Sequence, residues 1–353
     1  MSELPPRLTP RDSGDAWVEG PDGRRFWGRY GAAGLLVHDP AAGILLQHRA
    51  EWSHFGGTWG LPGGARHEGE SAVAGAIREA GEEAGVPADA LAIAFTSVLD
   101  LGFWSYETVV ARAARPFDPR IGDAESLELR WVPVEDVSAL PLHPGFGASW
   151  PRLRERLGEH IRVVVDAANV VGSRPDGWWK DRAGAAARLI GRVEALADHG
   201  VDADDFGLGP GRVWPAVSVV LEGAARAGAE PGAGGPAVGA GAGGTRVGDQ
   251  EAAEAAQAPA DRVGAATVRI VHASASGDDE IVAEVERVRG SGPAEREPTA
   301  RASGREADAE PLRLTVVVTA DRELSRRVSA LGAEVRGPRW LLDQLDAADA
   351  RRG

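Results

Sequence analysis

The stretch from Gly63 to Val86 restricts the fold of this chain more than any other part of its sequence. A glycine-rich entry leads into a segment that predicts a helix, opened by Ser71, a typical N-cap residue, and closed by Gly85, a typical C-cap residue. Small or aliphatic residues recur along it at helical spacing, at Val73, Ala76, Ile77, Ala80 and Ala84. This face of the helix should pack against a hydrophobic core.

A second face of the same helix carries three glutamates, Glu79, Glu82 and Glu83. Like charges at this spacing oppose a helix by about 0.2–0.5 kcal/mol per pair. Gly75 and Gly81 add a cost of roughly 1 kcal/mol each relative to alanine. Local rules broken in this way often mark a functional site. Grouped carboxylates suit Mg²⁺ or Mn²⁺, whose charge would offset the repulsion; the alternative is a surface helix with a solvated acidic face.

The spacing of these residues resembles the Nudix box. Gly64 is followed after five residues by Glu70, and after seven more by the run from Arg78 to Val86. The preceding segment, Trp59 to Gly64, also fits the entry to this motif, whereas Ala80 stands where the family usually has a bulkier aliphatic residue. The resemblance covers about residues 25–158 and implies an α/β/α sandwich with a mixed sheet.

This resemblance implies hydrolysis of a diphosphate linkage, with a nucleotide-derived small molecule as the substrate. It also implies that divalent metal ions are held by Glu79, Glu82 and Glu83, with the backbone carbonyl of Gly63 as a further ligand. In the same family pattern Arg78 pairs with and orients a glutamate, and Glu70 braces the loop against the helix.

Other residues near the box are open to two interpretations. The family draws its general base either from a box glutamate or from a downstream loop, where Glu125 lies; Glu125 could equally be an ordinary loop carboxylate. Phe55 and Trp59, with Trp52, could form an aromatic wall for a substrate base, although aromatic residues beside a strand more often belong to the core.

The second half of the chain alternates strand-like and helix-like segments, beginning with the β-branched run Ile161 to Val171. This alternation predicts an α/β domain with a parallel sheet. Acidic residues follow three of its predicted strands, at Asp166, at Asp278 and Asp279, and at Asp321. Because ligands gather at the carboxyl ends of parallel strands, these acids predict a Mg²⁺ or Mn²⁺ site; the alternative is that they only cap helices.

Four short motifs in this half resemble the NYN branch of the PIN-like nuclease superfamily. They are Val164 to Asn169, Gly177 to Leu189, Gly277 to Val282 and Thr319 to Leu324. The resemblance covers about residues 160–346 and implies a Rossmannoid, RNA-directed nuclease domain. Carried over, Asp166, Asp278 or Asp279, and Asp321 would bind metal, and Asn169 would support the site. Trp178, Trp179 and Lys180 could contact RNA, or the tryptophans could simply pack.

Composition limits the remaining possibilities. The formal net charge of −14 argues against bulk binding of a polyanion, and the lack of cysteine excludes a disulfide scaffold and a thiolate metal site. No apolar run is long enough to span a bilayer, so we expect a cytoplasmic protein with no membrane contact. Low-complexity stretches at about residues 223–262 and 289–311 predict disordered inserts.

The sequence thus predicts an α/β protein with a Nudix domain over residues 1–158 and an NYN/PIN-like domain over residues 159–348. The leading hypothesis is a Mg²⁺-dependent pyrophosphohydrolase joined to an RNase-like domain. One alternative is a regulator whose Nudix domain senses a nucleotide and controls the RNA-directed domain. Another is that only the RNase is active.

Overall fold

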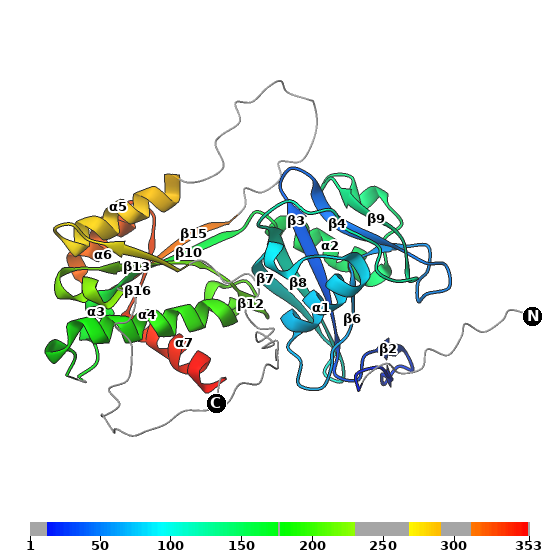
Figure 1. Cartoon of the computed structure of the whole chain (residues 1–353), viewed down its shortest axis with the longest axis horizontal. Coiled ribbons are helices and arrows are strands. Elements are labelled where there is room, and N and C mark those ends of the chain that lie inside the picture. Colours follow the sequence, from blue (N-terminus) through cyan, green and yellow to red (C-terminus); the bar gives the residue numbers. More distant parts are fainter. Residues whose placement is uncertain (1–12, 176, 230–267, 291–311, 352–353) are drawn as a thin grey trace, which may run out of the picture.

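The computed structural model describes residues 13–175, 177–229, 268–290 and 312–351. Two separate sheets with flanking helices lie side by side in it (Figure 1). No helix in this described part of the chain is both long and apolar enough to cross a membrane.

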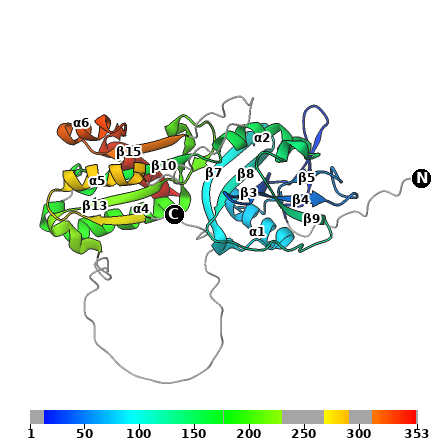
Figure 2. The same ribbon diagram turned by 90° about the horizontal axis from the view of Figure 1, so that it is seen from above.

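The first sheet is mixed and contains the box segment. Its main strand order is β11-β12-β7-β8-β3-β4-β5, with β6 paired to β3 and β9 paired to β4. The strands are β3 (Ala32–Asp39), β4 (Gly43–Arg49), β5 (Trp59–Gly60), β6 (Gly63–Ala65), β7 (Leu91–Asp100), β8 (Ser105–Ala113), β9 (Ser126–Val132), β11 (Val201–Asp202) and β12 (Arg212–Val213). Helices α1 (Ala72–Ala84) and α2 (Pro144–Arg156) cover its opposite faces (Figure 2).

Side chains alternate between the two faces of this sheet, as the pleat of a strand requires. On β3, Leu35 packs in the same cluster as Ile77 of α1, whereas Leu36 packs in the cluster of Trp150 of α2. The expected sandwich with a mixed sheet is therefore present in the first half.

The second sheet is fully parallel, in the order β14-β13-β10-β15-β16. Its strands are β10 (His160–Asp166), β13 (Ala216–Leu221), β14 (Val268–His272), β15 (Arg313–Val318) and β16 (Glu334–Arg336). The accompanying helices are α3 (Ala167–Gly172), α4 (Arg182–His199), α5 (Gly277–Gly290), α6 (Arg322–Ala330) and α7 (Pro338–Ala350). Helices α5 and α6 lie on one face, and α3, α4 and α7 on the other (Figure 1). The predicted parallel α/β arrangement is confirmed.

Two predicted strands differ from the structure: one ends earlier and the other is divided. The run from Ile161 does not continue to Val171, because Asp166 accepts a hydrogen bond from the Asn169 N–H and starts α3. The segment from Val213 to Leu221 is not one strand either, since it is interrupted at Trp214 and Pro215. Its first part belongs to the first sheet and its second part to the second sheet.

The split of this segment between the two sheets connects the two halves of the chain. Val213 of β12 pairs with Phe95 of β7, and both side chains are buried. Arg156 lies over the Phe95 ring at 4.0 Å and pairs with Glu159 at 2.9 Å. A segment from the second half therefore extends the sheet of the first.

The predicted inserts are partly wrong at their edges. Residues Gly223–Ala229 form a 3-10 helix, η5, rather than a flexible chain. Gly228 is buried, and a Cβ there would lie 2.4 Å from the Ala183 carbonyl oxygen, so glycine permits the close approach to α4. Arg289 and Gly290 complete α5. The rest of both predicted inserts, residues 230–262 and 291–311, lies outside the described residues.

Candidate active site

The box helix has the predicted ends. Ser71 Oγ accepts a hydrogen bond from the Ala74 N–H at 3.1 Å, and Gly85 adopts a left-handed conformation with φ of 61°. Ala76, Ala80 and Ala84 are fully buried, as the pattern predicted. Glu83 is also buried, with 6% of its surface exposed. The helix therefore directs one carboxylate into the protein interior.

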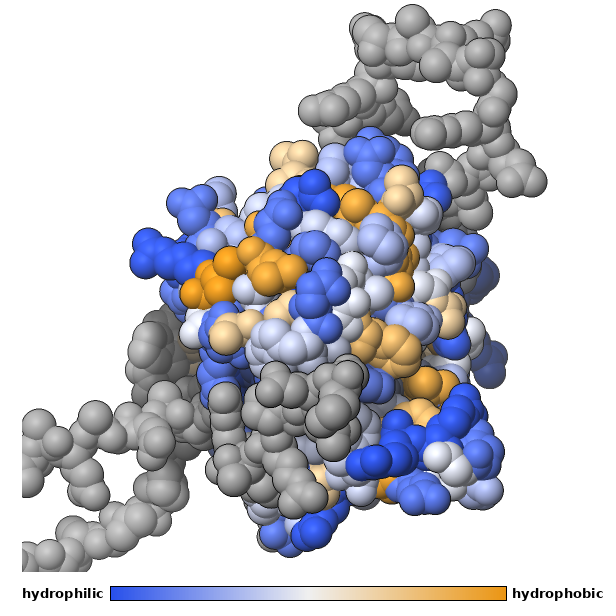
Figure 3. Space-filling model, turned by 90° about the vertical axis from the view of Figure 1, so that its right-hand side faces the viewer, coloured by the Kyte–Doolittle hydropathy of each residue, from blue (hydrophilic) through white to orange (hydrophobic). Residues whose placement is uncertain are grey.

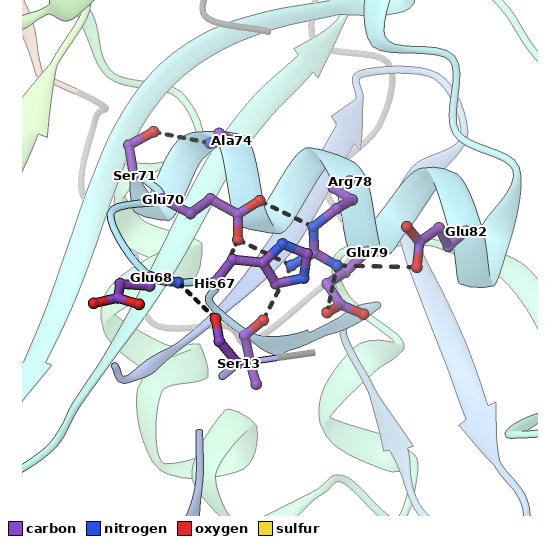
Figure 4. A network of polar contacts seen from close by, with 10 residues as sticks. Ser13, His67, Glu68, Glu70, Ser71, Ala74, Arg78, Glu79 and Glu82 are labelled. Carbon is purple, nitrogen blue, oxygen red and sulfur yellow. Dashed lines mark hydrogen bonds and ion pairs between the residues drawn. The ribbon is translucent and has the colours of Figure 1, made fainter. Parts of the chain in front are cut away.

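Arg78 organises the loop before the helix (Figure 4). Its Nε and Nη2 donate to the two oxygens of Glu70, both at 2.9 Å, and Nη2 also donates to the Ala65 carbonyl at 3.0 Å. The His67 N–H donates to the same Glu70 carboxylate at 2.9 Å. Burial alone would raise the pKa of Glu70, but these hydrogen bonds hold it below its usual value.

The same guanidinium links Glu70 to the acidic face of the helix. Its Nη1 donates to Glu79 at 2.8 Å and lies 3.9 Å from Glu82. Burial raises the pKa of Glu79 despite this partner. A Cβ at Gly64 would lie 2.6 Å from Glu79 Oε1, so a larger residue there would force the Glu79 carboxylate out of this position. Glu82 differs from Glu70 and Glu79 in its burial, because 66% of its side chain is exposed.

Glu83 lies on the other side of this loop. It accepts one hydrogen bond from the Gly63 N–H at 3.0 Å. Burial raises the pKa of Glu83 to about 8, and the charges of Glu79 and Asp123 act in the same direction. Arg49 opposes this effect but does not reverse it. The site thus contains a buried carboxylate without enough positive charge around it.

Asp123 is a site residue that the sequence interpretation missed. The loop before β9 is fixed to the end of α1, because the N–H groups of Arg120 and Gly122 donate to the carbonyls of Ala84 and Glu83, both at 2.9 Å. A Cβ at Gly122 would lie 1.7 Å from the Glu82 carbonyl oxygen. This contact brings the Asp123 carboxylate close to Glu83. Asp123 could have been found from the sequence because it lies in the same loop as Glu125, two residues before it.

Arg49, at the end of β4, was also missed. Its charge lowers the pKa of Glu83, its Nε donates to the His54 carbonyl at 3.1 Å, and its Nη2 lies 4.0 Å from Glu125. Arg49 therefore connects the box, the loop that contains Glu125 and the loop after β4.

The carboxylates of the box are chemically suited to a divalent cation, although they do not form a preassembled coordination site. Within the described ranges, no group of three or more His, Asp or Glu side chains is close enough to hold a metal ion. Glu79 and Glu83 nevertheless offer hard oxygen donors, and both have raised pKa values because burial is not balanced by positive charge. A divalent ion would supply that charge.

The two aromatic candidates lie in different environments. Trp59 is 5% exposed and belongs to the core; its ring stacks on His48 at 4.7 Å, and Arg130 lies over it at 4.3 Å. Phe55 is 46% exposed and contacts His54 and His143 at ring distances of 4.2 and 4.8 Å. Phe55 is thus the accessible member of the pair.

The acids of the second sheet meet at one edge. Asp166 accepts hydrogen bonds from the Asn169 N–H at 3.0 Å and from Thr319 Oγ1 at 2.8 Å. Burial raises its pKa, and the charges of Asp278 and Glu222 raise it further. Asp321 similarly acts on Asp278. Glu222 was not predicted from the sequence, although it comes directly after β13 and so has the same position at a strand end as the acids that were predicted.

The helix-cap interpretation holds for part of this group. Asp166 caps α3, and Asp321 caps α6 by accepting from the N–H groups of Glu323 and Leu324. Asp278 instead lies in the first turn of α5, which begins at Gly277, so it does not precede that helix. Asp279 is directed to Arg327, 2.6 Å away, and Asn169 Oδ1 accepts from the Ala320 N–H.

Comparison with known proteins finds relatives of the first half. The family model described as NUDIX domain matches residues 28–153. A Mycobacterium tuberculosis protein described as "Putative 8-oxo-dGTP diphosphatase 3" is 49% identical over 166 residues, which cover 44% of this chain and 76% of the relative. A Bifidobacterium longum "Nucleoside triphosphate pyrophosphatase/Nudix hydrolase fusion protein" is 41% identical over 164 residues, 44% of this chain and 34% of the relative. The solved structure of a Nudix hydrolase from M. smegmatis, RenU, is 52% identical, covers 40% of this chain and 94% of its own, and gives a TM-score of 0.38.

Proposed function

The chain belongs to the Nudix family of hydrolases, which act on acid anhydrides, and on this premise we propose that it cleaves the diphosphate linkage of a nucleoside diphosphate derivative. The observation that carries this proposal is the buried Glu83 carboxylate, 6% exposed, which the Gly63 N–H holds at the box loop at 3.0 Å. The charged form of a carboxylate in this environment is stabilised when a cation binds beside it.

Members of this family generally use divalent metal ions such as Mg²⁺. In this chain Glu79, Glu82 and Glu83 would hold Mg²⁺, or Mn²⁺, together with the Gly63 carbonyl. A divalent ion bound there offsets the charge of the diphosphate and acidifies water. Arg78 positions Glu79, and Glu70 fixes Arg78 in turn. These contacts keep the acidic face of α1 directed toward the box loop.

Two groups are suited to act on the substrate directly. Glu125 lies beside Arg49, and its carboxylate would accept the proton of the attacking water. Arg49 would place its positive charge against a substrate phosphate, since it lies close enough to influence Glu83. Phe55 would contact the base of the nucleotide from the exposed loop, whereas the packing of Trp59 gives it a supporting position behind that loop.

A substrate panel tests this proposal. We expect Mg²⁺-dependent hydrolysis of at least one of 8-oxo-dGTP, canonical nucleoside triphosphates, ADP-ribose, dinucleotides and nucleotide sugars. The triphosphates would release phosphate or pyrophosphate, whereas the compounds esterified at both ends would give two smaller phosphate esters. The double variant Glu82→Gln/Glu83→Gln should lose this turnover. The first compound follows the description of the Mycobacterium tuberculosis relative. Nucleotide binding with no turnover of any compound would reject the hydrolase and favour the sensing regulator.

For the second sheet, we propose a divalent-cation site in an NYN/PIN-like nuclease that acts on RNA. The meeting of Asp166, Glu222, Asp278 and Asp321 at one sheet edge supports the cation site. Asp166→Asn is the informative change, because asparagine preserves the cap of α3 while removing the charge. We expect it to reduce Mn²⁺-dependent cleavage of single-stranded RNA at least about tenfold, and Asp343→Asn, on an exposed part of α7, to leave cleavage unchanged. Equal RNA cleavage by Asp166→Asn and Asp343→Asn would show that the acids at this edge of the second sheet do not catalyse the reaction.

A further inference from the structure

A row of ring systems leads away from Arg49 across the surface of the first half. It consists of Trp17, His54, Phe55 and His143, with consecutive ring centroids 5.5, 4.2 and 4.8 Å apart. Trp17 and Phe55 are 42% and 46% exposed. Aromatic side chains of this size that remain half-exposed often mark binding surfaces. Figure 3 shows the end of the molecule that carries the first sheet, where hydrophobic residues lie among hydrophilic ones at the surface.

Trp17 comes from a hairpin that lies outside the two main sheets. Its strands β1 (Trp17–Glu19) and β2 (Arg25–Trp27) pair antiparallel, with Trp17 opposite Trp27. A hairpin this short is marginally stable by itself. Trp104 Nε1 donates to the Trp27 carbonyl at 3.1 Å, and the Phe26 ring packs on Trp104 at 4.7 Å. These contacts hold the hairpin in place and direct Trp17 toward His54.

The loop under Phe55 shows backbone strain. Phe55 has a φ of 56° and is the only non-glycine residue in the described segments with a positive φ. Its carbonyl accepts a hydrogen bond from Thr58 Oγ1 at 2.6 Å, and the Gly57 N–H donates to the Arg49 carbonyl at 2.9 Å. Strain of this kind persists only where the surroundings enforce it, and it concentrates at ligand sites. Here it presents the Phe55 ring at the surface.

The row adjoins the candidate active site through Arg49. Arg49 Nε donates to the His54 carbonyl, and the Arg49 charge acts on Glu83. Burial lowers the pKa of both His54 and His143, that of His143 to about 4, so both rings are neutral at pH 7. Arg25 lies over the Trp17 ring at 4.9 Å and provides the only cation seen stacked on this row within the described residues.

We propose that Trp17 and Phe55 bind the planar base of the nucleotide substrate by stacking, so that the N-terminal hairpin helps determine which nucleotide derivatives are accepted. This inference rests on the proposed nucleotide hydrolase. Base–aromatic stacking requires only a flat aromatic surface and contributes about 1–3 kcal/mol per base. The phosphates would then extend from the row past Arg49 to the box carboxylates.

The test compares substrates with and without a base. Trp17→Ala should raise the KM of the best nucleoside triphosphate about tenfold with kcat unchanged, as expected for about 1.4 kcal/mol of binding energy. Trp17→Phe should restore most of the affinity. The inhibition constant of inorganic triphosphate, which has no base, should be the same for all variants. Trp179→Ala is the matched control, because Trp179 is an exposed tryptophan, at 56%, that lies in the second half of the chain and has no part in the row.

Three results would overturn this inference. They are an unchanged nucleotide KM in Trp17→Ala, an equal loss of affinity for inorganic triphosphate, and an equal effect of Trp179→Ala on the nucleotide KM. Failure of the hydrolase proposal is recognised separately. If the wild-type protein hydrolyses no nucleotide, calorimetric titration with the same nucleotide measures the Trp17 effect on binding directly, and a loss confined to Trp17→Ala would support stacking without catalysis.

Discussion

Glu83→Gln is expected to remove diphosphate hydrolysis while stabilising the metal-free protein. Loss of an outer partner of a metal ligand commonly costs about 10–100-fold in activity, so loss of a ligand itself should cost at least about 100-fold. The stabilisation has a separate origin. Glutamine keeps the shape of the side chain and can accept the hydrogen bond from the Gly63 N–H, but it carries no buried charge.

The pH dependence of this stabilisation follows from the raised pKa of Glu83, about 8 in the folded protein. In the unfolded chain the carboxyl group loses its proton near its ordinary pKa of 4.5, whereas the folded protein retains it. Between these values the folded state binds more protons, so the free energy of unfolding of the wild-type protein falls as pH rises. The difference between Glu83→Gln and wild type should therefore grow from pH 5 to pH 8.

Thermal unfolding in EDTA across this pH range, together with Mg²⁺-dependent turnover, measures both effects. Glu82→Gln is the matched control, because the Glu82 side chain is 66% exposed. It should lower turnover without a comparable change in melting temperature. A Glu83→Gln protein that is less stable than wild type at pH 8 would show that Glu83 is not an uncompensated charge in the folded state.

Arg78→Met is expected to have the second-largest effect. It leaves Glu70 and Glu79 without the cation to which both are hydrogen-bonded. Breaking a buried ion pair by removing one partner costs roughly 3–5 kcal/mol. Because 22% of the Arg78 side chain is exposed, the lower end of this range, about 3 kcal/mol, is expected. Turnover should fall as well, since Glu79 loses its orientation.

A double-mutant cycle separates this network from general disruption. Glu70→Gln in the Arg78→Met background should cost much less than Glu70→Gln alone, with a coupling energy above about 1 kcal/mol in urea unfolding. Arg115→Met is the control for loss of an arginine, because Arg115 pairs with Asp89 at the surface and its loss should leave urea unfolding nearly unchanged. Additive effects of the Arg78 and Glu70 changes would argue against the network.

The local features of the box were predictable because they depend on neighbouring residues. Ser71 and Gly85 define the helix ends through cap hydrogen bonds and a left-handed backbone, both of which follow from residue type. The burial of Glu83 was not predictable in this way. It depends on a loop that lies far along the chain and is fixed by the N–H groups of Arg120 and Gly122, and backbone hydrogen bonds of this kind leave no side-chain pattern.

The same distinction holds for the second half. The acids Asp166 and Asp321 were recognisable as candidates because each lies beside a hydrophobic run, although the run from Ile161 was expected to continue past Asp166. The transfer of β12 to the first sheet was not, because Val213 pairs with Phe95 through long-range contacts that a pattern of apolar residues does not encode. The hairpin with Trp17 was missed because its strands have three residues each, too few to show alternation.

The most direct test of the central claim is the initial rate of diphosphate cleavage with Mg²⁺, measured for the wild-type protein and Glu83→Gln on the best compound of the substrate panel. The structure predicts a Mg²⁺-dependent rate for the wild type and a loss of at least about 100-fold in the variant, whose fold remains intact by thermal unfolding. Equal rates for the two proteins would contradict the assignment of the box carboxylates as the catalytic centre.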